Sequence, residues 1–136
     1  MNNNNNITLS PLLSKELMQL GYPQKGYDAT FMIIKGYGGQ EYIADNGTRE
    51  EYGYDIVCDS PTVSELMDNM IDCIIENDNH YNLTIIKVKD NYWVAYNCEA
   101  KSALISFDGN SLVECLGNLW VWCKEKGYKQ GDINEK

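Results

Sequence analysis

Catalysis in this 136-residue chain would have to use its single histidine, His80, or its carboxylates and thiols. His80 lies in the polar run 76–80, which is typical of a solvated turn rather than of an active site. Ser–His or Cys–His catalysis would need this histidine as its base, and the G-x-S-x-G elbow of hydrolases is absent. The sequence therefore predicts no catalytic residues and a protein that is not an enzyme.

The cysteines show neither a metal-binding nor a disulfide pattern. Their number is odd, no two form a C-x-x-C pair, and each lies within an apolar run. In a reducing compartment such residues pack as small hydrophobic side chains. We expect no metal site, no cofactor and no disulfide among Cys58, Cys73, Cys98, Cys115 and Cys123.

Acidic residues are concentrated in one part of the chain. From Glu50 to Ile86 there are nine carboxylates and no Lys or Arg, whereas the rest of the chain balances eleven acids with eleven bases. This stretch therefore supplies the whole formal charge of −9. Direct binding of nucleic acid is not expected, because phosphate contacts need clustered Lys and Arg.

Four of these acids follow the spacing of one helical face. Apolar residues recur at helical spacing from Val63 to Ile75, after the capping pair Ser60-Pro61, so an amphipathic helix is predicted over residues 60–76. Its acidic face is either a solvated surface or a docking surface for a basic protein partner. The residues of this face are Glu65, Asp68, Asp72 and Glu76.

Tyrosines are the second unusual feature of the composition. Four of them lie in or beside a glycine-rich segment, residues 36–53, where they either pack this long loop onto the domain or line a binding surface for a ligand. These candidate ligand-binding residues are Tyr37, Tyr42, Tyr52 and Tyr54.

The elements that must position these groups predict an α+β fold. We expect an antiparallel sheet of three to five strands with amphipathic helices packed on it, in the C-terminal order helix-strand-strand-strand-helix. A hairpin turn at Asp90-Asn91 would place Val88 opposite Trp93, and Trp93 is expected to face the core, as is Trp120. The other predicted elements are a short helix after Ser10-Pro11, strands at 31–35, 83–89, 92–98 and 102–107, and a last helix that ends at Gly127.

We interpret the two ends of the chain as polar tails that flank a single domain. Residues 1–9 form an Asn-rich tail that is expected to be disordered, residues 10–128 form a single domain, and residues 129–136 form a second polar tail. The first residues have no basic or apolar region of a signal peptide, and no apolar run is long enough to span a bilayer. We therefore expect a cytoplasmic protein with no membrane contact.

The C-terminal part resembles small proteins encoded by phages and prophages, including the type described as the phage ABA sandwich domain. The resemblance rests on the capped helix at 59–75, the aromatic strand at 91–96 and the strand-turn-helix at 106–116, and the opening segment 14–21 is also similar. The glycine- and tyrosine-rich segment before Asp55 departs from this pattern. The resemblance implies a fold and a bacterial host cell, and it transfers no active residues.

These observations favour a non-enzymatic, phage-like accessory protein that acts by protein–protein binding through the acidic helix face. One alternative is a small-molecule-binding protein or minor enzyme with a pocket near the Tyr/Gly-rich segment. A second alternative is a homo-oligomeric structural protein that assembles through an exposed sheet edge. The sequence leaves the oligomeric state open.

Overall fold

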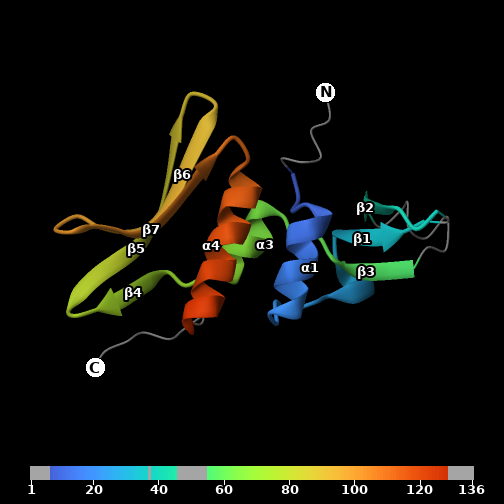
Figure 1. The fold of residues 1–136 in the computed structure, drawn as a ribbon, viewed down its shortest axis with the longest axis horizontal. Helices are drawn as coiled ribbons and strands as arrows, with labels where there is room; N and C mark the ends of the chain where they lie inside the picture. The colour runs from blue at the N-terminus through green and yellow to red at the C-terminus, as the bar shows by residue number, and fades with distance from the viewer. Residues whose placement is uncertain (1–6, 37, 46–54, 129–136) are drawn as a thin grey trace.

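The computed structural model describes residues 7–36, 38–45 and 55–128. Two antiparallel sheets lie on either side of a central layer of helices (Figure 1). The predicted α+β class is confirmed. The elements are α1 (Pro11–Gln19), η2 (Gly26–Asp28), β1 (Phe31–Lys35), β2 (Glu41–Asp45), β3 (Asp55–Asp59), α3 (Val63–Asp68), β4 (Cys73–Glu76), β5 (Asn79–Val88), β6 (Asn91–Cys98), β7 (Ser102–Gly109) and α4 (Leu112–Lys126).

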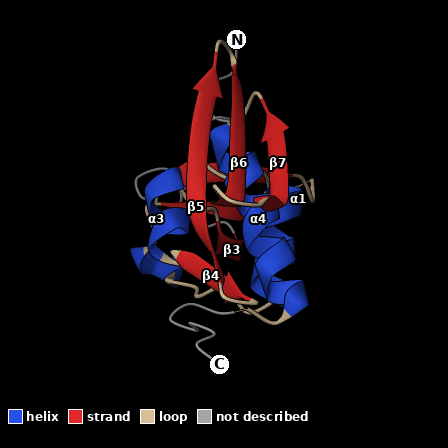
Figure 2. Cartoon of the chain, turned by 90° about the vertical axis from the view of Figure 1, so that its left-hand side faces the viewer, coloured by secondary structure: helices blue, strands red, loops and turns tan. Residues whose placement is uncertain are grey.

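The larger sheet has the order β4-β5-β6-β7, and the smaller one has the order β2-β1-β3. The main core lies between the larger sheet and the helices, where Val94 and Tyr96 of β6 meet Leu116 and Leu119 of α4. No described helix covers the opposite face of this sheet (Figure 2). Within the described residues, no helix is both long enough and apolar enough to cross a membrane.

The first helix packs along α4 and is tied to it by hydrogen bonds. Ser10 caps α1 with Pro11 at its first position, as the sequence predicts. The Ser10 backbone N–H and hydroxyl both donate to the Glu114 carboxylate, at 2.7 and 3.1 Å. Ordered structure begins before the expected boundary at residue 10, because Thr8 pairs with Thr62 and Leu9 is fully buried. The remainder of the two expected tails, 1–6 and 129–136, lies outside the described residues.

The predicted helix over residues 60–76 is wrong in both its start and its length. Thr62, not Ser60, caps α3, and the helix ends at Asp68 after six residues. The apolar run continues as strand β4, because Asn77 and Asp78 adopt φ angles of 52° and 67° and turn the chain into β5. The expected helical stop is therefore a hairpin turn. The C-terminal order gains a fourth strand, and His80 lies on β5 rather than in a turn.

The hairpin of β5 and β6 turns one residue earlier than predicted. Its register pairs Val88 with Asn91 and Ile86 with Trp93. Successive strand residues face opposite sides of a sheet, and Val94 is fully buried against the helices. Trp93 must therefore face away from them, so its predicted core position is wrong, whereas Trp120 is buried as expected.

Candidate functional site

A pocket of about 210 Å³ opens beside the last turns of α4. Trp120, Cys123 and Lys124 line it because residues three and four positions apart share one face of a helix. Tyr96 of β6 and the 69–71 segment after α3 complete its walls. The pocket thus lies where the central helices meet the larger sheet.

An aromatic wall and an ammonium group shape the mouth of this pocket. The Tyr22 ring packs edge-on against Trp120, with centroids 5.2 Å apart and an interplanar angle of 74°. Lys124 Nζ lies 5.6 Å from the centroid of the Trp120 ring, within the range of a cation–π contact. Gly21 forms the facing turn with a φ of +98°, a conformation that a side chain would strain.

The polar groups deeper in the pocket are neutral at physiological pH. The Tyr96 hydroxyl donates to the Ile71 carbonyl at 2.7 Å, and burial raises the pKa of Tyr96 well above its usual value. Burial also raises the pKa of the Cys123 thiol to about 11. A thiol that keeps its proton is a poor nucleophile. Among the described residues that line the pocket, Lys124 is the one basic side chain.

Tyr128 lines another side of the pocket and is held there by a hydrogen bond to a carboxylate. Its hydroxyl donates to the Glu76 carboxylate, and its ring stacks on Trp122 with centroids 5.8 Å apart. Burial and the neighbouring Glu76 raise the pKa of Tyr128 to about 12. The Glu76 carboxylate therefore lies next to the pocket without lining it.

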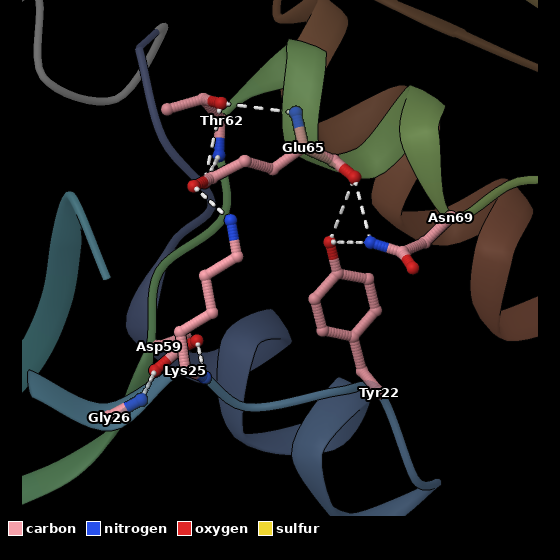
Figure 3. Close-up of polar contacts among 7 residues, drawn as sticks. All are labelled: Tyr22, Lys25, Gly26, Asp59, Thr62, Glu65 and Asn69. Carbon is pink, nitrogen blue, oxygen red and sulfur yellow. Dashed lines mark hydrogen bonds and ion pairs between the residues drawn. The ribbon is translucent and has the colours of Figure 1, made fainter. Parts of the chain in front are cut away.

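A hydrogen-bonded network holds two walls of the pocket in place (Figure 3). The Tyr22 hydroxyl donates to the Glu65 carbonyl at 3.1 Å and accepts from Asn69 Nδ2 at 3.2 Å. Asn69 Nδ2 also donates to the same carbonyl at 3.0 Å. Burial raises the pKa of Tyr22 to about 12, so it keeps its proton. The network fixes the 69–71 segment relative to the turn after α1.

Asp59 anchors the chain that follows this turn. Asp59 is 5% exposed, and its carboxylate accepts the backbone N–H groups of Lys25 at 2.6 Å and Gly26 at 3.1 Å. Its own N–H donates to Gln24 Oε1 at 2.8 Å. Figure 3 shows Asp59 close to the Lys25 side chain, which reaches the Glu65 carboxylate at 3.5 Å. Asp59 thus holds residues 24–26 against the end of β3.

The four acids of the predicted helical face do not share one helix. Glu65 and Asp68 lie on α3, Asp72 lies in the following loop, and Glu76 lies on β4. Glu65 caps its own helix by accepting the Thr62 N–H at 2.9 Å. Glu65 and Glu76 are half-buried, so only Asp68 and Asp72 of the four are exposed.

The predicted tyrosine-lined site is not brought together by the described residues. Tyr42 lies on β2, is 47% exposed and donates to Gln40. Tyr37, Tyr52 and Tyr54 lie outside the described residues. The pocket found at α4 lies elsewhere. The spacing of Trp120 and Lys124 on one helical face was its signal in the sequence, from which we predicted only a core position for Trp120.

Cys73 differs from the other cysteines. Cys58, Cys98, Cys115 and Cys123 are buried, as expected of small hydrophobic side chains, whereas Cys73 is half-buried on the outer face of the larger sheet. Its Sγ atom lies 3.8 Å from His80 Nδ1 on the neighbouring strand. The described residues contain no group of three or more His, Cys, Asp or Glu side chains placed to hold a metal ion.

Comparisons with protein-family models, curated proteins and solved structures find no match to this chain. Functional inference therefore rests on the geometry of the described residues. The likeness to phage-encoded proteins is still an expectation from the sequence pattern.

Proposed function

We propose that this chain is a non-enzymatic binding protein that holds a small carboxylate ligand in the pocket at α4. The observation that carries this proposal is a concave site with a tryptophan wall and one basic side chain, Lys124, at its mouth. Pockets with an apolar lining and a few well-placed polar groups are the usual sites for small ligands.

The volume of the pocket limits the ligand to a small one. Its 210 Å³ is somewhat larger than the roughly 150 Å³ of an apolar cavity that accommodates benzene. One ring with a short polar substituent fits this space. The ring would lie against Trp120, since offset and edge-on aromatic contacts are favourable.

The charge of the lining favours an anion over a cation. Cys123 and Tyr96 keep their protons at neutral pH, and the Glu76 carboxylate, which accepts from Tyr128, is not part of the lining. Lys124 would therefore repel an amine and attract a carboxylate. A charge-assisted hydrogen bond of this kind stabilises a complex by roughly 1.5–3 kcal/mol.

The same protonation states support binding rather than catalysis. Nucleophilic or general-base chemistry at neutral pH needs a group that gives up its proton readily. The raised pKa of about 11 leaves the Cys123 thiol protonated, and the Tyr96 hydroxyl already donates to a carbonyl.

Replacing Lys124 with methionine is expected to weaken binding of benzoate about tenfold or more, because the apolar stem stays and the charge is lost. Binding of benzamide, a neutral molecule of the same shape, should change little. Isothermal titration calorimetry measures both affinities. Lys126→Met is the matched control, since Lys126 lies in the same last turn of α4 and does not line the pocket.

Two results would contradict the proposal. One is a wild-type protein that binds neither probe at millimolar concentrations. The other is an equal loss of benzoate affinity in the Lys124 and Lys126 variants, which would show that the loss comes from the change in net charge and not from a contact in the pocket.

A second candidate function is docking of a basic protein partner, as a phage-like accessory protein would do. Its supporting observation is that Asp68 and Asp72 are exposed within the stretch that carries no Lys or Arg. In a pull-down from bacterial lysate, the double variant Asp68→Lys/Asp72→Lys should lose a partner that high salt also removes from wild type. Glu16→Lys/Glu125→Lys makes the same charge change elsewhere and should retain that partner. Equal behaviour of the two variants, or no captured partner, would exclude this function.

A further inference from the structure

Cys73 and His80 form a thiol–imidazole pair on the first hairpin of the larger sheet. Strand β4 is an edge strand of this sheet, and it pairs Cys73 with Asn82 of β5. His80 lies two residues before Asn82, so the two side chains are diagonal neighbours on one face of the sheet. Their Sγ and Nδ1 atoms are 3.8 Å apart, within hydrogen-bonding range for sulfur. The hairpin thus places a nucleophilic atom next to a proton acceptor.

Reagents can reach this thiol more readily than the other four. Cys73 is half-buried and His80 is exposed. The remaining cysteines are buried, and burial raises the pKa of Cys58 and of Cys123 to about 11. Thiols react as thiolates, so a buried thiol that keeps its proton reacts slowly. Cys73 is therefore the thiol that combines access from solvent with a neighbouring base.

A polar hollow of about 590 Å³ adjoins the pair on the side of His80. His80 itself lines the hollow, together with the amide side chains of Asn82 and Asn97. Two carboxylates, Asp78 and Glu99, also line it, and the described residues of the lining include no Lys or Arg. Charge complementarity therefore favours a positively charged group in this hollow over a negatively charged one.

We propose that Cys73 is a modification site that forms a mixed disulfide with a small, amine-bearing disulfide. His80 Nδ1 accepts the proton of the thiol, and the Cys73 thiolate attacks one sulfur of the reagent. A new S–S bond joins Cys73 to that half of the reagent while the old S–S bond breaks. The other half leaves with the bonding electron pair and takes up a proton, so Cys73 is oxidised and a free thiol is the reduced product. The hollow with Asp78 and Glu99 receives the ammonium group.

Reaction of the folded protein with cystamine, followed by intact-mass spectrometry, tests which thiol reacts. One cysteamine adduct should form rapidly, and peptide mapping should locate it at Cys73. Cys73→Ser should abolish the rapid adduct. Cys98→Ser is the matched control, because Cys98 is buried at the same hollow, and it should leave the adduct unchanged. A rapid adduct on another cysteine, or none on wild type, would overturn the proposal.

The rate of adduct formation tests the role of His80. His80→Gln should slow the reaction about tenfold at neutral pH, because the thiol loses its proton acceptor. At about pH 10 the variant should react as fast as wild type, since an ordinary thiol with a pKa of about 8.5 ionises there without help. His80 is exposed, so the variant should fold, which circular dichroism verifies. Equal rates of variant and wild type at neutral pH would overturn the proposal.

A charge variant tests the class of reagent. Asp78→Asn/Glu99→Gln should slow the reaction with cystamine about threefold, and it should not slow the reaction with dithiodipropionate, an anionic disulfide. Asparagine also tolerates the positive φ of 67° at position 78. Glu16→Gln/Glu125→Gln removes the same charge at exposed positions elsewhere and should react as wild type does. Equal cystamine rates in the two double variants would contradict a cation-selective hollow.

Discussion

Replacing Gly117 with leucine is expected to destabilise the protein by roughly 3 kcal/mol or more. Gly117 lies where α4 meets α1, and a Cβ atom added there would lie 2.6 Å from Leu9 Cδ1 and 2.9 Å from Leu13 Cδ2. Leu9 is fully buried and Leu13 nearly so, so neither side chain has free space to occupy. Urea unfolding followed by circular dichroism measures the change.

Two further variants separate packing from helix propensity. Asn118→Leu puts the same side chain on the exposed side of α4 and should change stability by no more than about 0.5 kcal/mol. Gly117→Ala should fall between the two, because alanine gains about 1 kcal/mol of helix propensity while its methyl group presses on Leu9. A Gly117→Leu variant with the same urea midpoint as wild type would contradict the close packing of Gly117 against Leu9 and Leu13.

Replacing Asp59 with alanine is expected to cost about 3 kcal/mol of stability. The substitution leaves the backbone N–H groups of Lys25 and Gly26 without their acceptor beside a nearly buried position. A hydrogen bond to a charged group contributes about 1.5–3 kcal/mol, and water can replace part of the two lost bonds because Lys25 is exposed and Gly26 is half-buried. The same urea titration measures the loss.

Asp55→Ala is the control for this prediction, because Asp55 lies on the same strand, β3, and is exposed. It should change stability by no more than about 0.5 kcal/mol. Asp59→Asn should recover part of the loss, since its amide oxygen can still accept one of the two N–H groups. A loss in Asp59→Ala no larger than that in Asp55→Ala would show that the anchor contributes little.

The sequence correctly predicted those elements whose ends carry a capping residue, a proline or a glycine. Ser10-Pro11 starts α1 and Gly127 ends α4, as the sequence predicts. The helix predicted after Thr62 was too long because the apolar residues fit a helical period. Over Cys73–Glu76 they also form a short apolar run, which is equally consistent with a strand. Hydrogen bonding to β5 makes this segment a strand rather than a helix. Such pairing depends on residues outside the segment, so the local sequence does not reveal it.

Non-local contacts explain why the candidate site was missed. Trp120 and Lys124 lie four residues apart, but Tyr96 and the 69–71 segment reach them only through the sheet and the turn after α3. Likewise, Cys73 and His80 meet only because β4 exists as a strand. The four acids of the predicted helical face share a spacing in the sequence, but the fold places them on a helix, a loop and a strand.

The measurement that tests the account most directly is a benzoate titration followed by NMR of the tryptophan indole N–H groups. The chain has three tryptophans: Trp120 lines the pocket, Trp122 stacks on Tyr128, and Trp93 lies on the outer face of the sheet. The Trp120 signal should shift and saturate while the Trp93 signal stays in place. A Trp120 signal that does not move, or equal shifts of Trp120 and Trp93, would contradict a ligand site at α4.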